Sequence, residues 1–344
     1  IRDPETSRGL GDVYKRQEPI ETIYLGGGTP SQLAKEDFEA IFSHIYKVYK
    51  VTPNAEITLE ANPDDFTSEY ISMLRTFPFN RISMGIQTFQ ETTLKQLQRR
   101  HTADQAIRAF QGCRTAGFQN ISIDLMYGLP GETLTSWKKD LKQALSLHPE
   151  HISAYHLIYE EGTTLWQLRE QHKLEEADED LSVSLFGTLI DSLTAAGYEH
   201  YEISNFCLPG FHSRHNSSYW TEKKYLGCGP SAHSYNGTSR QWNVASLNEY
   251  IRGISNGNPT FEVEELDLYT RYNDFVITHI RTQWGMPLPK LRKQYGEELY
   301  KYCLRMATPH LQQGTLEIKN DTLKLTRKGV FISDGIMSDM LWVE

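Results

Sequence analysis

Short apolar runs alternate with amphipathic stretches from about residue 21 to residue 206. The runs have the length of buried strands, and we expect strands at 22–25, 56–60, 81–86, 120–126, 151–158 and 199–203. Between them, apolar positions recur at the three- and four-residue spacing of a helix that buries one face. Three such stripes are Phe38-Ile41-Phe42-Ile45-Val48, Ala106-Ile107-Phe110-Cys113 and Trp137-Leu141-Ala144-Leu145.

A strand followed by a helix, repeated along the chain, predicts a fold of the α/β class. Each strand–helix pair has the length of a right-handed βα crossover. Successive crossovers build a parallel sheet, either open or curled into a barrel. Gly117 follows the second helical stripe, and we expect it to end that helix.

The pattern changes after residue 206. His, Gly, Asn and aromatic residues dominate 207–245, which we expect to be rich in loops. The remainder, 246–344, predicts a small α+β accessory domain that is mostly helical. Its one expected hairpin lies between residues 314 and 325, where alternating apolar and charged residues flank Asn320 and Asp321. The predicted domains are therefore a barrel over 18–206, the loop-rich segment 207–245 and the domain 246–344.

Polar residues close several of the predicted strands. Glu60, Gln87 and Asp124 lie at or near the ends of successive strands, and a glycine-rich loop, Gly26-Gly27-Gly28-Thr29-Pro30, follows the first. The carboxyl ends of parallel strands share one rim, where folds of this class bind ligands. Three glycines also let a polar ligand approach backbone N–H and C=O groups. We therefore expect a ligand site at this rim.

Four motifs carry a resemblance to a known family. They are GGGTPS at 26–31, LEANPD at 59–64, SMGIQ at 83–87 and IDLMYGLPGET at 123–133. In this order and spacing they resemble the radical S-adenosylmethionine (SAM) family of HemW and the oxygen-independent coproporphyrinogen III oxidases, from about residue 21 to the C-terminus. The resemblance implies an incomplete parallel (β/α)6 barrel whose rim holds SAM beside a [4Fe–4S] cluster, followed by the accessory domain.

The resemblance also implies which residues bind SAM. Gly27, Gly28 and Thr29 match positions that contact its amino-acid end. The other matching positions are Glu60, Gln87, Arg99, Asp124 and Ile158. These residue types suit the ligand, because carboxylates accept hydrogen bonds from hydroxyl and amino groups and an arginine can clamp a carboxylate.

One departure from the family concerns the cluster. Family members carry C-x3-C-x2-C after a first strand, upstream of the glycine-rich loop, and its three thiolates hold the cluster. This chain has four widely separated cysteines, Cys113, Cys207, Cys228 and Cys303, and no such motif. We therefore expect no metal ligands, a barrel without its first strand, an N-terminally truncated chain, and no radical chemistry in the chain as written.

A second motif lies in the loop-rich segment. His215-Asn216-Ser217-Ser218-Tyr219-Trp220 resembles the H-N-x-x-Y-W motif that distinguishes HemW from the oxidases. An imidazole can ligate haem iron, and Tyr and Trp can cover a porphyrin face. The resemblance implies a haem site at His215, Tyr219 and Trp220; alternatively, these residues only pack the segment against the barrel.

A zinc site is a rival interpretation of the same segment. Two cysteines and two histidines are the right ligand types and number for zinc. The spacings of Cys207, His212, His215 and Cys228 fit no common zinc finger.

Residues 1–17 show neither helical nor strand periodicity. Asp12-Val13-Tyr14-Lys15-Arg16-Gln17 can be back-translated into DNA that resembles a transposon end used to build sequencing libraries. We expect 1–17 to be a non-native or disordered leader; the alternative is an ordinary polar leader of the protein.

Composition limits the partners. The net charge of −9 argues against a general nucleic-acid binder, which would concentrate Lys and Arg. The sequence has no run of about 18 apolar residues, so it predicts no transmembrane helix. Sparse, unpaired cysteines favour a reducing cytoplasm over a disulfide framework.

The resemblance, with its H-N-x-x-Y-W motif, implies a HemW-like haem chaperone that binds haem and delivers it to haem-requiring proteins. One alternative is an oxygen-independent coproporphyrinogen III oxidase, which decarboxylates a porphyrin precursor by radical SAM chemistry. Another is a cluster-free structural or interaction module.

Overall fold

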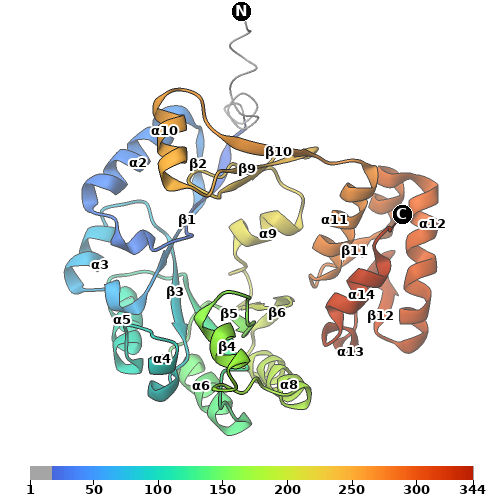
Figure 1. Ribbon diagram of the computed structural model, residues 1–344, viewed down its shortest axis with the longest axis horizontal. Helices are drawn as coiled ribbons and strands as arrows, with labels where there is room; N and C mark the ends of the chain where they lie inside the picture. Colours follow the sequence, from blue (N-terminus) through green and yellow to red (C-terminus); the bar gives the residue numbers. More distant parts are fainter. Residues whose placement is uncertain (1–17, 344) are drawn as a thin grey trace, which may run out of the picture. The chain divides into compact units, whose positions relative to one another are not determined.

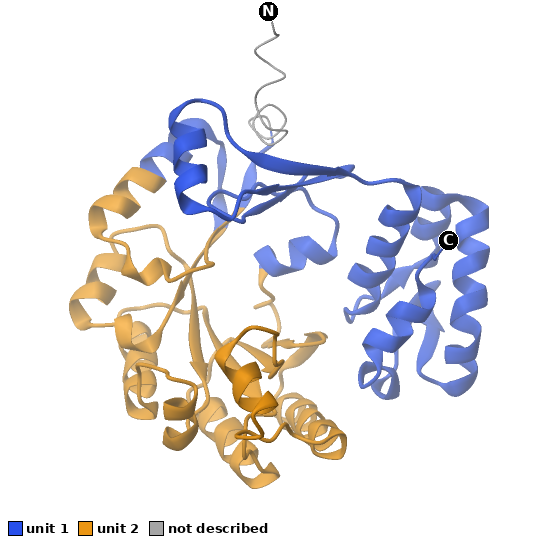
Figure 2. Ribbon diagram, viewed as in Figure 1, with its two compact units in different colours: residues 1–21, 42–55, 214–344 blue, residues 22–41, 56–213 orange. Residues whose placement is uncertain are grey.

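The computed structural model describes residues 18–343 of the chain. Its contacts divide these residues into two units (Figure 2). The barrel unit contains residues 22–41 and 56–213, and the C-terminal unit contains residues 18–21, 42–55 and 214–343. None of the helices in the described part of the chain combines the length and hydrophobicity of a transmembrane span.

A seven-stranded sheet forms the centre of the barrel unit, in the order β1-β2-β3-β4-β5-β7-β6. Neighbouring strands from β2 to β5 are parallel, as predicted. Figure 1 shows the sheet curling, with α3, α4, α5, α6 and α8 along its outer side. The strands are β1 (Ile20–Leu25), β2 (Val51–Ala61), β3 (Arg81–Gln87), β4 (Ile121–Tyr127), β5 (His151–His156), β6 (Glu199–Glu202) and β7 (Asn205–Cys207).

The far edge of the sheet differs from a simple succession of parallel strands. The expected last strand is present as β6, but β7 lies between β5 and β6 and is antiparallel to both. A tight reversal after β6 returns the chain at once, so β7 takes the place beside β5. The three-residue β7 was missed because it is too short to show periodicity.

The helices of the barrel unit begin where local sequence provides caps. Thr102 and Gln105 form a capping box at the start of α5, and Thr133 and Ser136 form another at α6. Gly117, with φ of +94°, follows the end of α5 as predicted. The helices are α2 (Lys35–Val48), α3 (Ser68–Leu74), α4 (Glu91–Gln96), α5 (Ala103–Thr115), α6 (Leu134–Ser146), α7 (Thr164–Glu170) and α8 (Glu179–Ala195), with short turns η1 (Pro30–Gln32) and η2 (Pro63–Asp65). Residues 42–48 of α2 count with the C-terminal unit.

The predicted helical stripes supply the core. Trp137 is fully buried, packs against Tyr127 with ring centroids 5.6 Å apart, and donates a hydrogen bond to the Leu185 carbonyl at 3.0 Å. Cys113 is buried in α5, as the stripe indicated. Burial of one face of each helix against the sheet is the main source of stability of such a layered fold.

The C-terminal unit combines helices with two small antiparallel sheets, ordered β10-β9-β8 and β11-β13-β12. The predicted hairpin is β12 and β13, with Leu316 opposite Leu325. The elements are α9 (Arg214–Trp220), β8 (His233–Tyr235), β9 (Ser239–Asn243), α10 (Leu247–Ser255), β10 (Phe261–Glu265), α11 (Leu268–Ile280), β11 (Met286–Pro287), α12 (Leu288–Gln313), β12 (Leu316–Lys319), β13 (Thr322–Leu325), α13 (Arg327–Val330) and α14 (Ser333–Met340).

The segment 207–245 is more regular than expected. It contains α9, β8 and β9, and β9 pairs with β10 from the segment predicted to be mainly helical. Most β10 residues are exposed, so the buried apolar alternation that signals a strand is weak there. The predicted boundaries at 206 and 245 remain predictions, and the leader 1–17 lies outside the described residues.

Candidate functional site

The sheet carries four of the candidate residues to one rim of the barrel unit. Glu60 is next to last in β2, Gln87 ends β3, Asp124 lies within β4, and Ile158 follows β5 by two residues. Since β2 to β5 are parallel, these positions face the carboxyl rim. Ile158 is 75% exposed, so its side chain is available to a ligand there.

The glycine-rich loop lies directly against Glu60. The Glu60 carboxylate accepts a hydrogen bond from the Gly27 N–H at 3.2 Å and another from the Tyr24 hydroxyl. A Cβ on Gly26 would lie 2.8 Å from the Glu60 carboxyl carbon and would also collide with the Tyr24 ring. By contrast, Gly27, with φ of +95°, and Gly28 face open space. Gly26 therefore allows close packing, whereas Gly27 and Gly28 leave room for a ligand.

Asp124 is the second acidic group of the rim. The Ser83 hydroxyl donates to its carboxylate, with both oxygens at 3.4 Å. Burial, followed by the negative charge of Glu60, raises the Asp124 pKa to about 7. Burial and then the charge of Asp124 raise the pKa of Tyr155 to about 12. The rim thus holds two carboxyl groups that a bound amino or hydroxyl group would stabilise in their charged form.

Arg99 is held in place from two sides. Its Nη2 donates to Asn62 Oδ1 at 2.6 Å and to the Gly85 carbonyl at 3.0 Å. Its Nε is buried and has no hydrogen-bond partner within residues 18–343. Gln87 adopts a φ of +70°, and a Cβ on Gly85 would lie 2.9 Å from Gln87 Nε2. An N–H without an acceptor, on a guanidinium that is fixed through its other nitrogen, fits a site that gains an acceptor from a ligand.

Thr29 connects the loop to the first short helical turn. It precedes η1, and its side chain makes no capping hydrogen bond there. The next residue but one, Ser31, donates to Asp65 Oδ2 at 2.6 Å, which ties this turn to η2. The loop is thus anchored at both ends, by Glu60 before it and Asp65 after it.

The H-N-x-x-Y-W motif forms helix α9 in the C-terminal unit. His215 Nε2 and the Tyr219 hydroxyl lie 3.0 Å apart, and their rings are perpendicular with centroids 5.3 Å apart. Burial lowers the His215 pKa to about 4, so the imidazole is neutral at neutral pH. Tyr219 also meets Tyr225 edge to face at 4.8 Å.

Trp220 has a different environment from the other two motif residues. A helix advances about 100° per residue, so His215 and Tyr219 share a face while Trp220 points away from it. The Arg281 guanidinium lies 4.3 Å from the Trp220 ring centroid. The indole Nε1 is buried without a hydrogen-bond partner among the described residues. The structure thus brings His215 and Tyr219 together and separates Trp220 from them.

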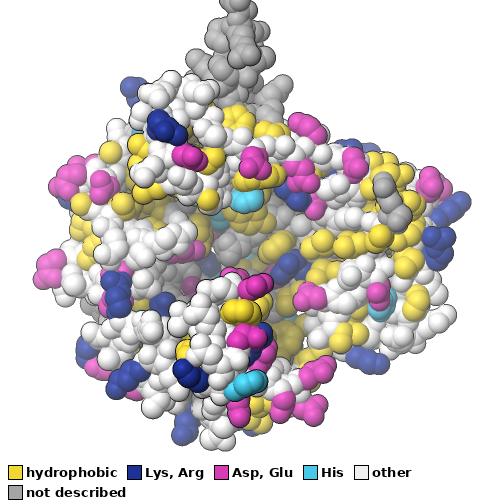
Figure 3. Space-filling view, in the orientation of Figure 1, with side chains coloured by type: hydrophobic (Ala, Val, Ile, Leu, Met, Phe, Trp, Pro, Cys, Tyr) yellow, Lys and Arg dark blue, Asp and Glu magenta, His cyan; other side chains and the backbone are white. Residues whose placement is uncertain are grey.

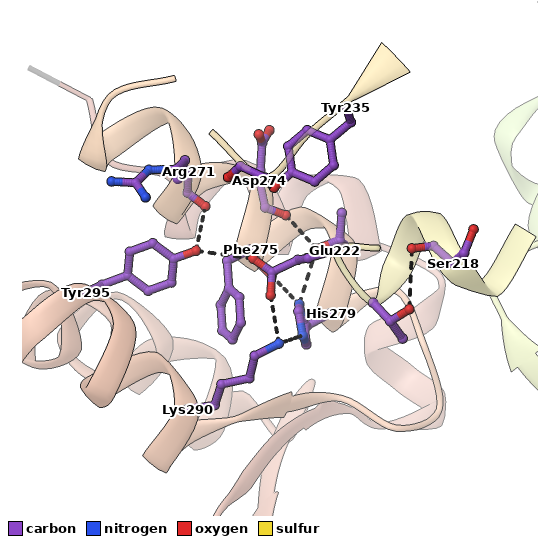
Figure 4. Close-up of polar contacts among 12 residues, drawn as sticks. Ser218, Glu222, Tyr235, Arg271, Asp274, Phe275, His279, Lys290 and Tyr295 are labelled. Atoms are coloured by element: carbon purple, nitrogen blue, oxygen red, sulfur yellow. Dashed lines mark hydrogen bonds and ion pairs between the residues drawn. The ribbon is translucent and has the colours of Figure 1, made fainter. Parts of the chain in front are cut away.

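Glu222, two residues after α9, anchors the segment to α11 and α12 (Figure 4). Glu222, with φ of +56°, accepts from Lys290 Nζ at 2.7 Å and from the Tyr295 hydroxyl at 3.4 Å. Lys290 Nζ also lies 3.4 Å from His279 Nε2. Burial and the charge of Lys290 lower the His279 pKa to about 4, so His279 stays neutral and accepts from the lysine.

The four proposed zinc ligands are divided between the two units. Cys207 and His212 belong to the barrel unit and lie near Glu199, whereas His215 and Cys228 belong to the C-terminal unit. Cys228 is exposed, and it follows Gly227, where a Cβ would collide with the His233 backbone.

Comparison with known proteins decides the family. A profile of the radical SAM superfamily matches residues 1–144, and a profile of the HemN C-terminal domain matches residues 266–332. The heme chaperone HemW of Bacillus subtilis (strain 168) is 31% identical over 335 residues, which are 96% of this chain and 88% of that protein. The heme chaperone HemW of Haemophilus influenzae is 33% identical over 332 residues, covering 96% and 85% of the two chains. The chain belongs to the HemW family of radical SAM proteins.

A solved structure agrees with this fold. Coproporphyrinogen III oxidase (HemN) from Escherichia coli, a radical SAM enzyme, superposes with a TM-score of 0.80 over 94% of this chain and 78% of its own. At 21% identity this likeness establishes the shared fold alone. The predicted incomplete radical SAM barrel with a C-terminal accessory domain is confirmed.

Radical SAM proteins generally use SAM and a [4Fe–4S] cluster. The rim residues fit SAM, because open space lies over Gly27 and Gly28 and the Arg99 Nε has no acceptor among the described residues. The cysteines do not fit a cluster. Three of them are buried in separate elements, Cys113 in α5, Cys207 in β7 and Cys303 in α12, and the fourth, Cys228, is exposed in the C-terminal unit. No radical step is therefore assigned to the residues of this HemW-family chain.

Sequence reasoning missed several residues that build the rim. Tyr24, Ser83 and Asn62 hold Glu60, Asp124 and Arg99, respectively. All three lie in or beside the family motifs, and this position was the sequence signal by which they could have been found. Their roles depend on which side chains face each other across neighbouring strands, and this requires the register of the sheet.

Proposed function

We propose that this HemW-family chain binds haem at helix α9 and passes it to haem-requiring proteins, while the rim of its barrel unit binds SAM. The single observation that carries the haem proposal is the His215–Tyr219 pair on one face of α9. The relatives from B. subtilis and H. influenzae are both named heme chaperones, which supports haem as the cargo.

The chemistry of His215 suits a ligand that is picked up and released. Iron needs a neutral imidazole, and the His215 pKa of about 4 keeps the ring neutral. Nε2 is engaged with the Tyr219 hydroxyl at 3.0 Å. Ligation through Nε2 must therefore displace this hydrogen bond, which lowers the net affinity by about 1 kcal/mol and favours reversible binding.

Trp220 has a supporting role in this proposal. The Arg281 guanidinium lies over one face of its indole, so Trp220 anchors α9 to the end of α11 and leaves only its other face for a porphyrin. Its buried Nε1–H remains available to a carboxylate or carbonyl acceptor. Tyr219 and Tyr225, which meet edge to face, supply the aromatic surface next to His215.

For SAM, Gly27, Gly28 and Thr29 would contact the amino-acid end, and Glu60, Gln87, Arg99, Asp124 and Ile158 would hold the rest. Bound SAM supplies a sulfonium whose reductive cleavage needs an electron from an iron–sulfur cluster. In this chain the rim residues bind and orient the molecule: Glu60 and Asp124 accept hydrogen bonds, and Arg99 donates to a carboxylate.

The cysteines bear on the compartment in which the protein acts. We place the protein in the reducing cytoplasm, where the buried thiols of Cys113 and Cys303 persist. The described face in Figure 3 intersperses Lys and Arg with Asp and Glu, and this supports a protein or porphyrin partner over nucleic acid.

Haemin titration of the folded full chain tests the haem site. We expect a shifted Soret band, and His215→Ala should weaken binding roughly tenfold, equivalent to about 1.4 kcal/mol, and change the spectrum. His233→Ala is the matched control, because His233 is an exposed histidine of the same unit outside the motif. Tyr219→Phe should remove the hydrogen bond to Nε2 and tighten binding.

Identical binding by wild type and His215→Ala would make α9 a structural segment. Coproporphyrinogen III would then become the ligand to test, since this chain shares its fold with the coproporphyrinogen III oxidase HemN. Failure to bind either porphyrin would support the structural module. Circular dichroism of each variant must match wild type, because misfolded chains bind haem nonspecifically.

A further inference from the structure

The β6–β7 hairpin of the barrel unit places three metal-ligating side chains together. Glu199 begins β6 and Cys207 ends β7, and the two residues are directly opposite in the antiparallel register. Residues opposite each other project to the same side of a hairpin. The chain then turns, with Phe211 N–H donating to the Leu208 carbonyl at 3.0 Å, and brings back His212.

The donor atoms of these residues converge. His212 Nε2 lies 2.9 Å from Glu199 Oε2, and one donor atom from each of the three residues lies within 4.8 Å of the others. Cys207 is fully buried, whereas the side chains of His212 and Glu199 are 26% and 37% exposed. The cluster therefore has a closed side formed by the thiol and an open side toward solvent.

We propose that Glu199, Cys207 and His212 bind one divalent transition-metal ion of the zinc class. Thiolate, imidazole and carboxylate are the ligands that Zn²⁺ prefers. Three protein ligands on one side leave the fourth tetrahedral position toward the exposed edge, where water can fill it. The proposal is independent of haem and of SAM.

Charge balance supports a dipositive ion here. With Zn²⁺, one thiolate, one carboxylate and a neutral imidazole, the site has no net charge, which suits a half-buried position. Arg81 is buried nearby and its positive charge acts on Cys207. A site without net charge meets little repulsion from this arginine, whereas an unpaired metal ion would be repelled.

The same residues do not suit nucleophilic catalysis. A cysteine, a histidine and a carboxylate can form a catalytic triad when the thiol is accessible and acidic. Burial, followed by the charge of Glu199, raises the Cys207 pKa to about 12. The thiol is also inaccessible to a substrate. Metal binding differs, because the ion itself displaces the thiol proton.

The position of the site indicates a structural role. Cys207 also pairs with His151, the first residue of β5, so the site lies at the end of the sheet opposite the SAM rim. That end of a β/α barrel contributes stability rather than catalysis. A bound ion would tie the start of β6, the end of β7 and the turn at His212, two residues before α9 begins.

Cobalt and zinc titrations of the metal-free full chain test the proposal. Every sample carries Cys228→Ser, because this exposed thiol could bind metal on its own. Co²⁺ should give one equivalent of a thiolate-to-cobalt charge-transfer band in the near ultraviolet, and Zn²⁺ should abolish that band and raise the melting temperature.

Matched variants assign the ligands. Cys207→Ser should remove the charge-transfer band, whereas Cys113→Ser, which alters another buried thiol of the same unit, should keep it. Should Cys207→Ser fail to fold, His212→Gln and Glu199→Gln retain the thiol and should each weaken Co²⁺ binding at least tenfold. Absence of the band from the Cys228→Ser chain, or an unchanged band after the further change Cys207→Ser or in both other variants, would overturn the proposal.

Discussion

Gly26→Ala offers a direct test of how the glycine-rich loop is built. The added Cβ would lie 2.8 Å from the Glu60 carboxyl carbon and would collide with the Tyr24 ring. Both neighbours are side chains, so they can move without a shift of the backbone. Their movement separates the Tyr24 hydroxyl from Glu60 and weakens the Gly27 N–H···Glu60 hydrogen bond.

The expected cost follows from these two hydrogen bonds. A hydrogen bond to a charged group contributes roughly 1.5–3 kcal/mol, and the half-buried position of Glu60 favours the lower end of this range. We therefore expect Gly26→Ala to lower the free energy of unfolding by about 1.5–2 kcal/mol. Gly28→Ala should change it by less than about 0.5 kcal/mol, because nothing lies within 4 Å of the new Cβ.

Urea unfolding followed by circular dichroism provides the measurement, with Tyr24→Phe as a second variant. Tyr24→Phe removes the same hydroxyl, so the double variant should cost about 1 kcal/mol less than the sum of the single variants. Gly28→Ala should instead weaken SAM binding roughly tenfold by calorimetry, about 1.4 kcal/mol, because its methyl group fills the ligand space. Equal stabilities of Gly26→Ala and Gly28→Ala, or strictly additive costs, would refute this account of the loop.

Two further predictions concern charged groups. Burial and the charge of Glu60 raise the Asp124 pKa from 3.8 to about 7. Between these two pH values the folded state binds more protons than the unfolded state. The free energy of unfolding therefore falls as pH rises from about 4 to about 7. Asp124→Asn should make this decline shallower in urea midpoints measured across the range, without removing it, because burial also raises the Glu132 pKa to about 7. Asp104→Asn, on the surface of α5, is the control. Glu222→Gln should lower the free energy of unfolding by about 1 kcal/mol, a value reduced because Lys290 is partly exposed. Glu297→Gln, whose ion pairs are exposed, should lower it by less than about 0.5 kcal/mol. Equal losses in chemical denaturation would contradict the anchoring role of Glu222.

Much of the barrel could be predicted from the sequence because its elements are long and buried. Ile121, Ile123 and Leu125 of β4 are fully buried, and burial of every second apolar residue is the pattern of a strand. The helices between the strands bury one face, so their stripes were equally visible. The β8–β9–β10 sheet escaped prediction because β8 and β9 are short and β10 is largely exposed, so the pattern of apolar residues alone does not mark these strands.

Some of the candidate site residues could also be predicted from the sequence, and others could not. Positions at strand ends follow from chain order, so Glu60, Gln87 and Asp124 could be assigned to one rim before their contacts were known. The Glu199–Cys207–His212 cluster could not, because it depends on the register of one hairpin and a turn, and a shift of one residue would point Cys207 to the other face. The zinc hypothesis therefore selected two residues of this cluster, Cys207 and His212, on residue type alone. Glu199, which has no cysteine or histidine near it in sequence except His200, became a candidate partner only through its place opposite Cys207.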